Sequence, residues 1–239
     1  MIYKTLLLSI LLLLVSCGGG GTSATVAPTT PPPIVVVETP VVSPIALFYK
    51  QDDVAGYGGS VDIQDGEATF TSNTNPKCLE LWMCRRVELS KKVTLPIRFS
   101  YSFEILEWDV DEYKCGTHKG LPKGCYIILH QFWNQQAAPR AYAVIQKKPD
   151  GRFKLSFHNK NDAGVVDYVW ETYISEGIHT IEIFNDGYGA SLTVNGETSG
   201  YHELDVTYST QEYLKWGMYW QKEMTGNVVI KFSDVSLDE

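Results

Sequence analysis

The sequence is short of positive charge: among 239 residues, 20 Lys and Arg stand against 28 Asp and Glu, a formal net charge of −8. This deficit argues against a general nucleic-acid binder, which has to neutralise many phosphates. Long apolar runs are absent after the N-terminal segment, so nothing downstream of it is expected to span a membrane. The chain also lacks a Gly-rich phosphate loop, which argues against a nucleotide-binding enzyme of that type. It lacks a Gly-x-Ser-x-Gly nucleophile elbow as well, which argues against a serine hydrolase of that type.

Residues 1–16 are typical of a bacterial signal peptide, in which a lysine precedes an apolar stretch. The stretch ends in Leu14-Val15-Ser16-Cys17, which resembles the lipobox of bacterial lipoproteins and predicts cleavage before a lipidated Cys17. An ordinary secretory signal with an incidental cysteine is the alternative. Gly18 is not the aspartate that retains many lipoproteins at the inner membrane. We therefore expect a lipoprotein of the bacterial cell envelope, at the outer membrane or cell surface, held to the membrane by its N-terminal lipid only.

Residues 17–44 are rich in Gly, Thr, Ser and Pro, a composition that predicts a flexible tether. The globular domain is expected over residues 45–239, which is long enough to bury a large core.

Of the five cysteines, four remain once Cys17 is set aside, and an even number in an oxidising compartment favours two disulfides. Three connectivities are possible, and we favour the local pairing Cys78–Cys84 and Cys115–Cys125. Zinc is the alternative, but the spacings match no common zinc motif, so no metal and no other cofactor is predicted.

Alternation of apolar and polar residues indicates that the domain is nearly all β. From Ile97 to Ile105 every odd position is apolar or aromatic and every even position is polar. Turn residues separate such segments at Pro149-Asp150-Gly151, Asp186-Gly187 and Asn195-Gly196. No long helical period is present, although residues 209–213 can hold one helical turn. Many short strands in one domain predict an all-β sandwich or jelly roll. Further strands are expected near residues 60–64, 67–72, 79–90, 125–133, 141–147, 153–158, 166–171, 179–184, 190–194, 213–221 and 227–236.

The segment 213–221 is the most informative in the chain. As a strand it directs one set of side chains into the core: Leu214, Trp216, Met218 and Trp220. The other face receives a polar and aromatic row: Tyr213, Lys215, Gly217, Tyr219 and Gln221. Such a row suits a polar ligand, and the glycine is expected to leave room for the ligand to approach the sheet. An ordinary solvated face is the alternative.

This segment resembles the Tyr-Phe-Lys-Ala-Gly-Val-Tyr-Asn-Gln motif of the alginate lyases in polysaccharide lyase family 7. It is also similar to the Lys-Trp-Gly-Ile-Tyr element of heparin-lyase-like proteins. Residues 86–90, Arg-Val-Glu-Leu-Ser, resemble the family's Arg-(Ser/Thr)-Glu-Leu-Arg. Residues 129–133, Leu-His-Gln-Phe-Trp, resemble its Gly-Gln-Ile-His, with Trp133 where the histidine is expected. The resemblance implies a concanavalin-like jelly roll, a β-sandwich, over residues 45–239.

The resemblance also implies β-elimination at a uronic acid, in which the C5 proton is removed and the bond to O4 breaks. Arg86 and Gln131 match residues that neutralise the uronate carboxylate while enolate charge develops. Tyr219 matches the family's tyrosine, which is the implied acid and, in a syn elimination, also the base. Lys215 is expected to favour its phenolate by proximity, and Glu88 to hold Arg86 in place.

The partner implied is an acidic polysaccharide bound in an open groove. Because the chain is acidic overall, we expect its basic side chains to be concentrated in this groove. The predicted substrate contacts are Glu88, Trp133, Tyr213, Gln221, His118, Lys123 and Arg140.

The missing histidine leaves the base in question. Trp133 offers stacking but no proton transfer. The adjacent His130 is directed away from the groove by a regular strand, unless a bulge intervenes. His118, between two of the cysteines, is a candidate replacement. Three other histidines have no motif around them and are interpreted as structural: His158, His179 and His202.

Two other functions stay open: a non-catalytic carbohydrate-binding lipoprotein of the same fold, which the tryptophan favours, and a structural surface lipoprotein without a sugar ligand. A family 16 glycosidase is disfavoured because residues 104–109, Glu-Ile-Leu-Glu-Trp-Asp, lack the carboxylate spacing of that family. The protein is expected to be a monomer.

Overall fold

The computed structural model describes residues 44–50, 59–74, 86–110, 117–118, 121–122, 126–133, 139–160, 166–204, 211–220 and 226–239. The chain divides into two units, Met1–Pro40 and Val41–Glu239, and all described residues lie in the second. Predictions for the signal peptide, for Cys17 and for most of the tether lie outside these residues, as do those for Cys78, Cys84, Cys115 and Cys125.

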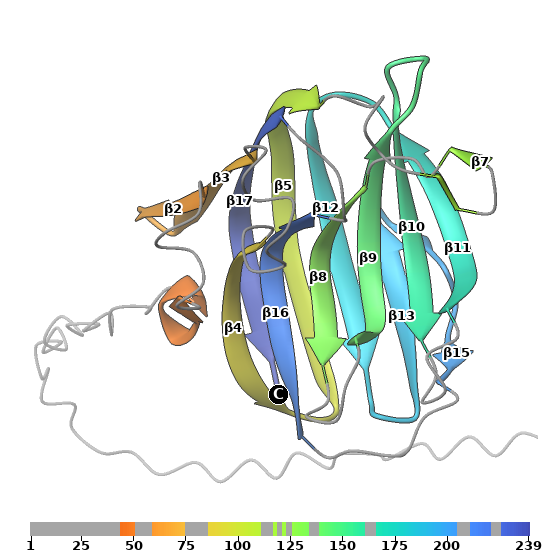
Figure 1. Cartoon of the computed structure of the whole chain (residues 1–239). Helices are drawn as coiled ribbons and strands as arrows, with labels where there is room; N and C mark the ends of the chain where they lie inside the picture. Colours follow the sequence, from red (N-terminus) through yellow and green to blue (C-terminus); the bar gives the residue numbers. More distant parts are fainter. Residues whose placement is uncertain are drawn as a thin grey trace, which may run out of the picture. The chain divides into compact units, whose positions relative to one another are not determined.

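The described strands form two large antiparallel sheets (Figure 1). The seven-stranded sheet has the order β1 (Tyr49–Lys50), β4 (Arg86–Thr94), β16 (Gln211–Trp220), β8 (Ile127–Trp133), β9 (Pro139–Lys147), β10 (Phe153–Lys160) and β11 (Val166–Ile174). Five of these strands, from β16 to β11, follow one another across the front of Figure 1.

The second sheet has eight strands within the described ranges. Its order is β14 (Glu197–Thr198), β13 (Gly189–Val194), β12 (Ile178–Asn185), β5 (Ile97–Val110), β17 (Gly226–Asp238), β3 (Glu67–Thr74) and β2 (Gly59–Gln64), and β15 (His202–Glu203) pairs with β13. A separate hairpin joins β6 (Thr117–His118) and β7 (Leu121–Pro122). A 3₁₀ turn, η1 (Pro44–Leu47), precedes β1.

The core lies between the two large sheets and is rich in aromatic rings. Trp216 on β16 packs edge-on against Phe70 on β3 and Phe232 on β17, with ring centroids 5.4 and 5.0 Å apart. All three side chains are fully buried. Because Trp216 belongs to one sheet and its two partners to the other, these contacts hold the sandwich together.

The predicted all-β sandwich is therefore confirmed. Each expected strand that falls within the described ranges is present, and β4 continues beyond the expected end to Thr94. The expected turns join β9 to β10, β12 to β13 and β13 to β14. The last of these, Asn195-Gly196, has φ angles of 51° and 84°, as a tight hairpin turn requires. A helical turn over 209–213 was the wrong interpretation at residues 211–213, where pairing with β4 extends β16.

Candidate functional site

Strand β16 separates its side chains as the alternation predicts. Trp216 and Trp220 are fully buried in the core, as are Leu214 and Met218. Tyr213, Lys215 and Tyr219 alternate with them and lie on the other side of the seven-stranded sheet, which we call the outer face. The polar row of the sequence is therefore a row on one face of a sheet.

Gly217 does not have the role expected from the sequence. Its φ is +136°, in the region that favours glycine, and a Cβ there would lie 2.3 Å from the Val87 carbonyl oxygen and 2.5 Å from the Phe70 ring. The pairing with β8 also shifts register between Trp216 and Tyr219, so β16 carries a bulge here. The glycine allows β16 to approach β4 and the core, rather than opening space for a ligand.

The outer face brings an arginine onto the ring of Tyr219. Arg86 on β4 is the direct cross-strand partner of Tyr219. Its guanidinium carbon lies 4.5 Å from the centre of the Tyr219 ring and 5.9 Å from that of Trp133 on β8. Lys215 lies over Trp133, with its ammonium nitrogen 4.6 Å from the ring centre. Two cations and two aromatic rings thus gather on three adjacent strands, with Arg86 in contact with the Tyr219 ring.

Gln131 is fixed by Glu88. The amide nitrogen of Gln131 donates a hydrogen bond of 2.7 Å to Glu88 Oε1, and both side chains are almost fully buried. Because a carboxylate only accepts, this bond sets which end of the amide faces Glu88. Within the described part of the chain, Gln131 Oε1 has no hydrogen-bond partner. A hydroxyl group that donates to this oxygen would satisfy a buried acceptor.

A bulge is present near His130, but it does not turn the imidazole outward. The pairing of β8 with β9 shifts register between Ile128 and His130. His130 is fully buried, and its Nδ1 lies 2.7 Å from the hydroxyl oxygen of Tyr101 in a hydrogen bond. Burial lowers the pKa of His130 to about 3. This histidine is a neutral core residue, so it is not a candidate for the base that the family resemblance implies.

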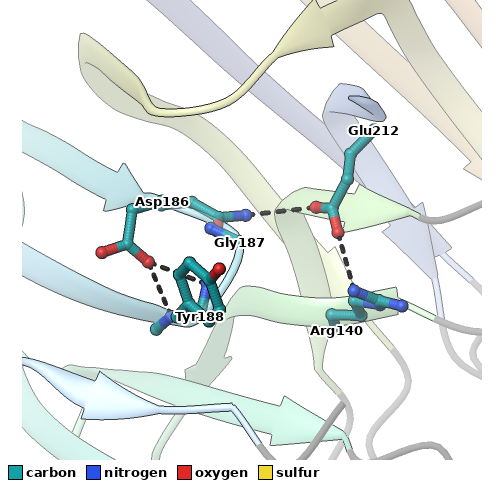
Figure 2. Close-up of polar contacts among 7 residues, drawn as sticks. Arg140, Asp186, Gly187, Tyr188 and Glu212 are labelled. Atoms are coloured by element: carbon teal, nitrogen blue, oxygen red, sulfur yellow. Dashed lines mark hydrogen bonds and ion pairs between the residues drawn. The ribbon is translucent and has the colours of Figure 1, made fainter. Parts of the chain in front are cut away.

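Arg140 does not lie where a substrate contact is expected. A register shift at the end of β8 places Phe132 opposite Ala141 and Trp133 opposite Pro139, so Arg140 lies at a bulge between these two pairs. Its guanidinium is 3% exposed and lies 3.3 Å from a carboxylate oxygen of Glu212 (Figure 2). Arg140 therefore belongs to a buried ion pair and is not a residue of the candidate site.

Glu212 also links its own strand, β16, to the second sheet. Its other carboxylate oxygen accepts a 3.1 Å hydrogen bond from the Asn185 amide at the end of β12. Asn185 in turn accepts from the backbone of Gly187, in the turn shown beside the ion pair in Figure 2. Burial raises the pKa of Glu212, and the charge of Arg140 opposes that shift. The network connects β9, β16 and the β12–β13 turn.

Of the four remaining predicted substrate contacts, the structure describes Tyr213 and the backbone of His118. Tyr213 is half-buried on the outer face, opposite Trp133. His118 lies in β6, and the structure describes only its backbone. Lys123 and Gln221 lie outside the described residues.

The outer face also contains residues that the motif comparison missed. Ile128, Tyr142 and Val144 form a second apolar cluster, and Tyr126 and Tyr219 pack against it. Beyond it His158 stands opposite Tyr142 on β9 and opposite Tyr168 on β11. A signal for His158 exists in the sequence, because Phe153, Leu155 and Phe157 alternate with it and are core residues.

Metal ligands and membrane helices were both sought in the described ranges. No group of three or more His, Cys, Asp or Glu side chains there is arranged to hold a metal ion. No helix among the same residues is long and apolar enough to cross a membrane.

No protein-family model matches the sequence, and no curated protein matches it. Solved structures do share its fold. The marine PL7 alginate lyase AlyA1 from Zobellia galactanivorans superimposes with a TM-score of 0.55 at 14% identity, over 80% of this chain and 82% of that one. The alginate lyase from Alteromonas sp. 272 gives 0.52 at 12% identity, over 81% and 94%. A functionally unknown protein from Saccharomyces cerevisiae gives 0.52 at 14%, over 81% and 97%. The predicted jelly roll resembling the alginate lyases is confirmed, and identities this low establish the fold alone.

Proposed function

We propose that the protein is a lyase that cleaves an acidic, uronate-containing polysaccharide by β-elimination on the outer face of the seven-stranded sheet. The observation that carries the proposal is the contact between Arg86 and Tyr219 on neighbouring strands, with Gln131 on the same face. An alginate-lyase-like fold supports it, because the three matched motifs fall on adjacent strands of that fold. We call Arg86, Gln131, Lys215 and Tyr219 the proposed reaction site.

The proposed chemistry requires a proton donor and acceptor beside a cation. The reaction removes the C5 proton, forms a C4–C5 double bond and breaks the C4–O4 bond, and the leaving O4 takes up a proton. The Tyr219 hydroxyl serves as the acid and, as phenolate, as the base in a syn elimination. The guanidinium of Arg86, held against the Tyr219 ring, pairs with the uronate carboxylate and stabilises negative charge as it develops.

Gln131 and Lys215 have supporting roles in this scheme. Because Glu88 holds the Gln131 amide in one orientation, Gln131 presents an acceptor and its second N–H at fixed positions. Lys215, held over Trp133, supplies a second cation for a carboxylate of the polymer.

The test is an absorbance screen of the wild-type protein on polymannuronate, polyguluronate, hyaluronan and heparin. A lyase produces an unsaturated uronate that absorbs in the ultraviolet, whereas a hydrolase or a binding protein does not. Absorbance that rises with at least one polymer supports the proposal. No rise with any of them contradicts it.

A second candidate function is non-catalytic binding of the same kind of polysaccharide. The observation that favours it is that Trp133 occupies the position expected for a histidine, while the adjacent His130 lies in the core. Retention of a polymer in affinity electrophoresis without any rise in absorbance would select this function.

The predicted lipid on Cys17 would place either activity at the bacterial cell envelope. A Cys17→Ser variant should lose its partition into detergent. Equal partition of the variant and the wild type would contradict the anchor.

A further inference from the structure

One row of side chains crosses the outer face from the proposed reaction site to the edge strand β11. Cross-strand pairing places Lys215 opposite Gln131, Gln131 opposite Tyr142, Tyr142 opposite His158, and His158 opposite Tyr168. Strands in a sheet are about 4.8 Å apart, so Tyr168 on β11 lies three strands, or about 14 Å, from Gln131 on β8. A bound polymer could therefore contact both ends of this row at once.

The far end of the row is a stack of rings. The centroids of His158 and Tyr168 are 4.3 Å apart, and those of His158 and Tyr142 are 5.1 Å apart. His158 is buried and its Nε2 is hydrogen-bonded to Ser156 Oγ at 2.8 Å, which fixes the imidazole. Tyr168 is 71% exposed. The exposed Tyr168 ring thus contacts the buried His158 ring, which contacts the buried Tyr142 ring in turn, an arrangement that restricts Tyr168 at low entropic cost.

Charge near this stack suits an acidic sugar. The Lys154 ammonium lies 5.9 Å from the centre of the Tyr168 ring and 2.8 Å from a carboxylate oxygen of Glu171. Glu171 is half exposed, so this ion pair is weak and a sugar carboxylate can compete for the lysine. The imidazole stays neutral at physiological pH, because burial lowers the pKa of His158 to about 4.

The stack is continuous with the proposed reaction site. Tyr126 packs with Tyr219 against the apolar cluster of Ile128, Tyr142 and Val144. Burial raises the pKa of Tyr126 to about 12, with further contributions from the neighbouring Tyr168 and Tyr219. Tyr219 and Tyr126 thus both adjoin the apolar cluster that contains Tyr142, and ring contacts lead from Tyr142 through His158 to Tyr168.

We propose that Tyr142, His158 and Tyr168 form a distal saccharide subsite, in which the C–H face of a sugar ring of the polymer stacks on Tyr168. This inference rests on the proposed polysaccharide ligand, but it does not require that the polymer is cut. Its role is to bind a sugar some distance from the reacting one, so it should act only on chains long enough to reach both places.

The experiment compares oligosaccharides of two, four, six and eight residues from polymannuronate, polyguluronate and hyaluronan. Binding is measured by calorimetry on the full chain, in a Tyr219→Phe background if the wild type cleaves them. We expect Tyr168→Ala to weaken binding of the longest ligand about tenfold, as the loss of one aromatic stacking contact implies, and to leave the disaccharide unchanged. Tyr168→Phe keeps the ring and should bind as the wild type does.

Tyr188→Ala is the matched control, since Tyr188 is 62% exposed but lies in the turn between β12 and β13 of the other sheet. It should leave every affinity unchanged. Equal affinities of Tyr168→Ala and the control at all lengths would overturn the subsite, as would an equal loss at all lengths or a wild type that binds none of the ligands. A length-dependent loss in a protein that never forms the unsaturated product would support the subsite and reject the lyase.

Discussion

His130 and Gln131 are adjacent in the sequence, yet they belong to different environments of the same sheet. His130 lies on the inner face among Phe99 and Tyr101, with its pKa lowered to about 3 by burial. Gln131 lies on the outer face, held by Glu88 in the row that contains Lys215. The side chains of the inner face are close-packed in the core, whereas the outer face pairs polar and charged groups with aromatic rings.

The comparison separates stability from proposed chemistry. A change on the inner face should reduce the free energy of unfolding and spare turnover by the folded molecules. A conservative change on the outer face should reduce turnover and leave the free energy of unfolding nearly unchanged. Four predictions, in decreasing order of expected effect, test this division.

The largest effect is expected from Tyr219→Phe on the outer face. The variant keeps the ring that packs against the apolar cluster and loses the hydroxyl that we propose transfers the proton. We expect kcat to fall about 10²- to 10⁴-fold, as is usual for loss of an acid–base group, with little change in the free energy of unfolding. Steady-state kinetics and urea unfolding measure the two quantities.

Trp216→Phe is the inner-face counterpart of that variant. Trp216 is fully buried against Phe70 and Phe232, so the smaller ring should destabilise the fold by about 2 kcal/mol and leave kcat unchanged. If Tyr219→Phe retained full activity while Trp216→Phe lost it, the assignment of chemistry to the outer face would be wrong.

The second prediction concerns Arg140, which the sequence assigned to the substrate and the structure places in a buried ion pair. Arg140→Ala leaves the Glu212 carboxylate uncompensated between the sheets, and we expect a loss of about 3–5 kcal/mol in the free energy of unfolding. KM, measured at a temperature where the variant is folded, should not change.

A double variant sharpens this test. Glu212→Gln removes the buried charge and keeps an acceptor for Asn185, so adding it to Arg140→Ala should recover part of the lost stability. A large rise in KM for Arg140→Ala without loss of stability would instead return Arg140 to the substrate site.

The third prediction is that Arg86→Ala impairs both binding and turnover. It removes the charge-assisted contact proposed for the uronate carboxylate, so kcat/KM should fall about 10- to 100-fold. Arg86→Lys keeps the charge without the bidentate geometry and should recover only part of the activity. Kinetics unchanged in both variants would contradict the role of Arg86.

The alternating pattern predicted the strands and the inner face, because core burial imposes a period of two on each strand. It assigned Leu214, Trp216, Met218 and Trp220 correctly. The errors at Gly217 and Arg140 both lie at β-bulges. A bulge depends on how two distant segments pair, which no local pattern contains.

His158 was missed for a different reason. The alternation around it is enough to place it on the side opposite the core, but without a motif it was interpreted as structural. Its neighbours Tyr142 and Tyr168 come from β9 and β11, and only the order of strands brings them together. The motifs, in contrast, indicated Arg86, Gln131 and Tyr219 because each is marked within its own strand.

The smallest expected effect is a pH dependence of stability that originates on the inner face. In the unfolded chain a histidine has a pKa near 6.5, whereas burial lowers the pKa of folded His130 to about 3. The unfolded state therefore binds more protons as the pH falls below about 6.5, so the stability contributed by neutral His130 is complete above that pH and is lost on acidification. The slope is about 1 kcal/mol per pH unit for this residue, and His158, with a pKa lowered to about 4, adds a similar loss.

Urea unfolding between pH 7 and pH 5.2 measures the slope before the carboxylates of the unfolded chain become protonated. His130→Gln removes one titrating group, so its slope should be smaller than that of the wild type by about 1 kcal/mol per pH unit. His158→Gln, on the outer face, should show a similar reduction, because the loss depends on burial and not on which face the histidine occupies. An unchanged slope in His130→Gln would mean that the imidazole reaches water in the folded protein. The division between a packed inner face and a polar outer face would then fail at the residue that defines it most sharply.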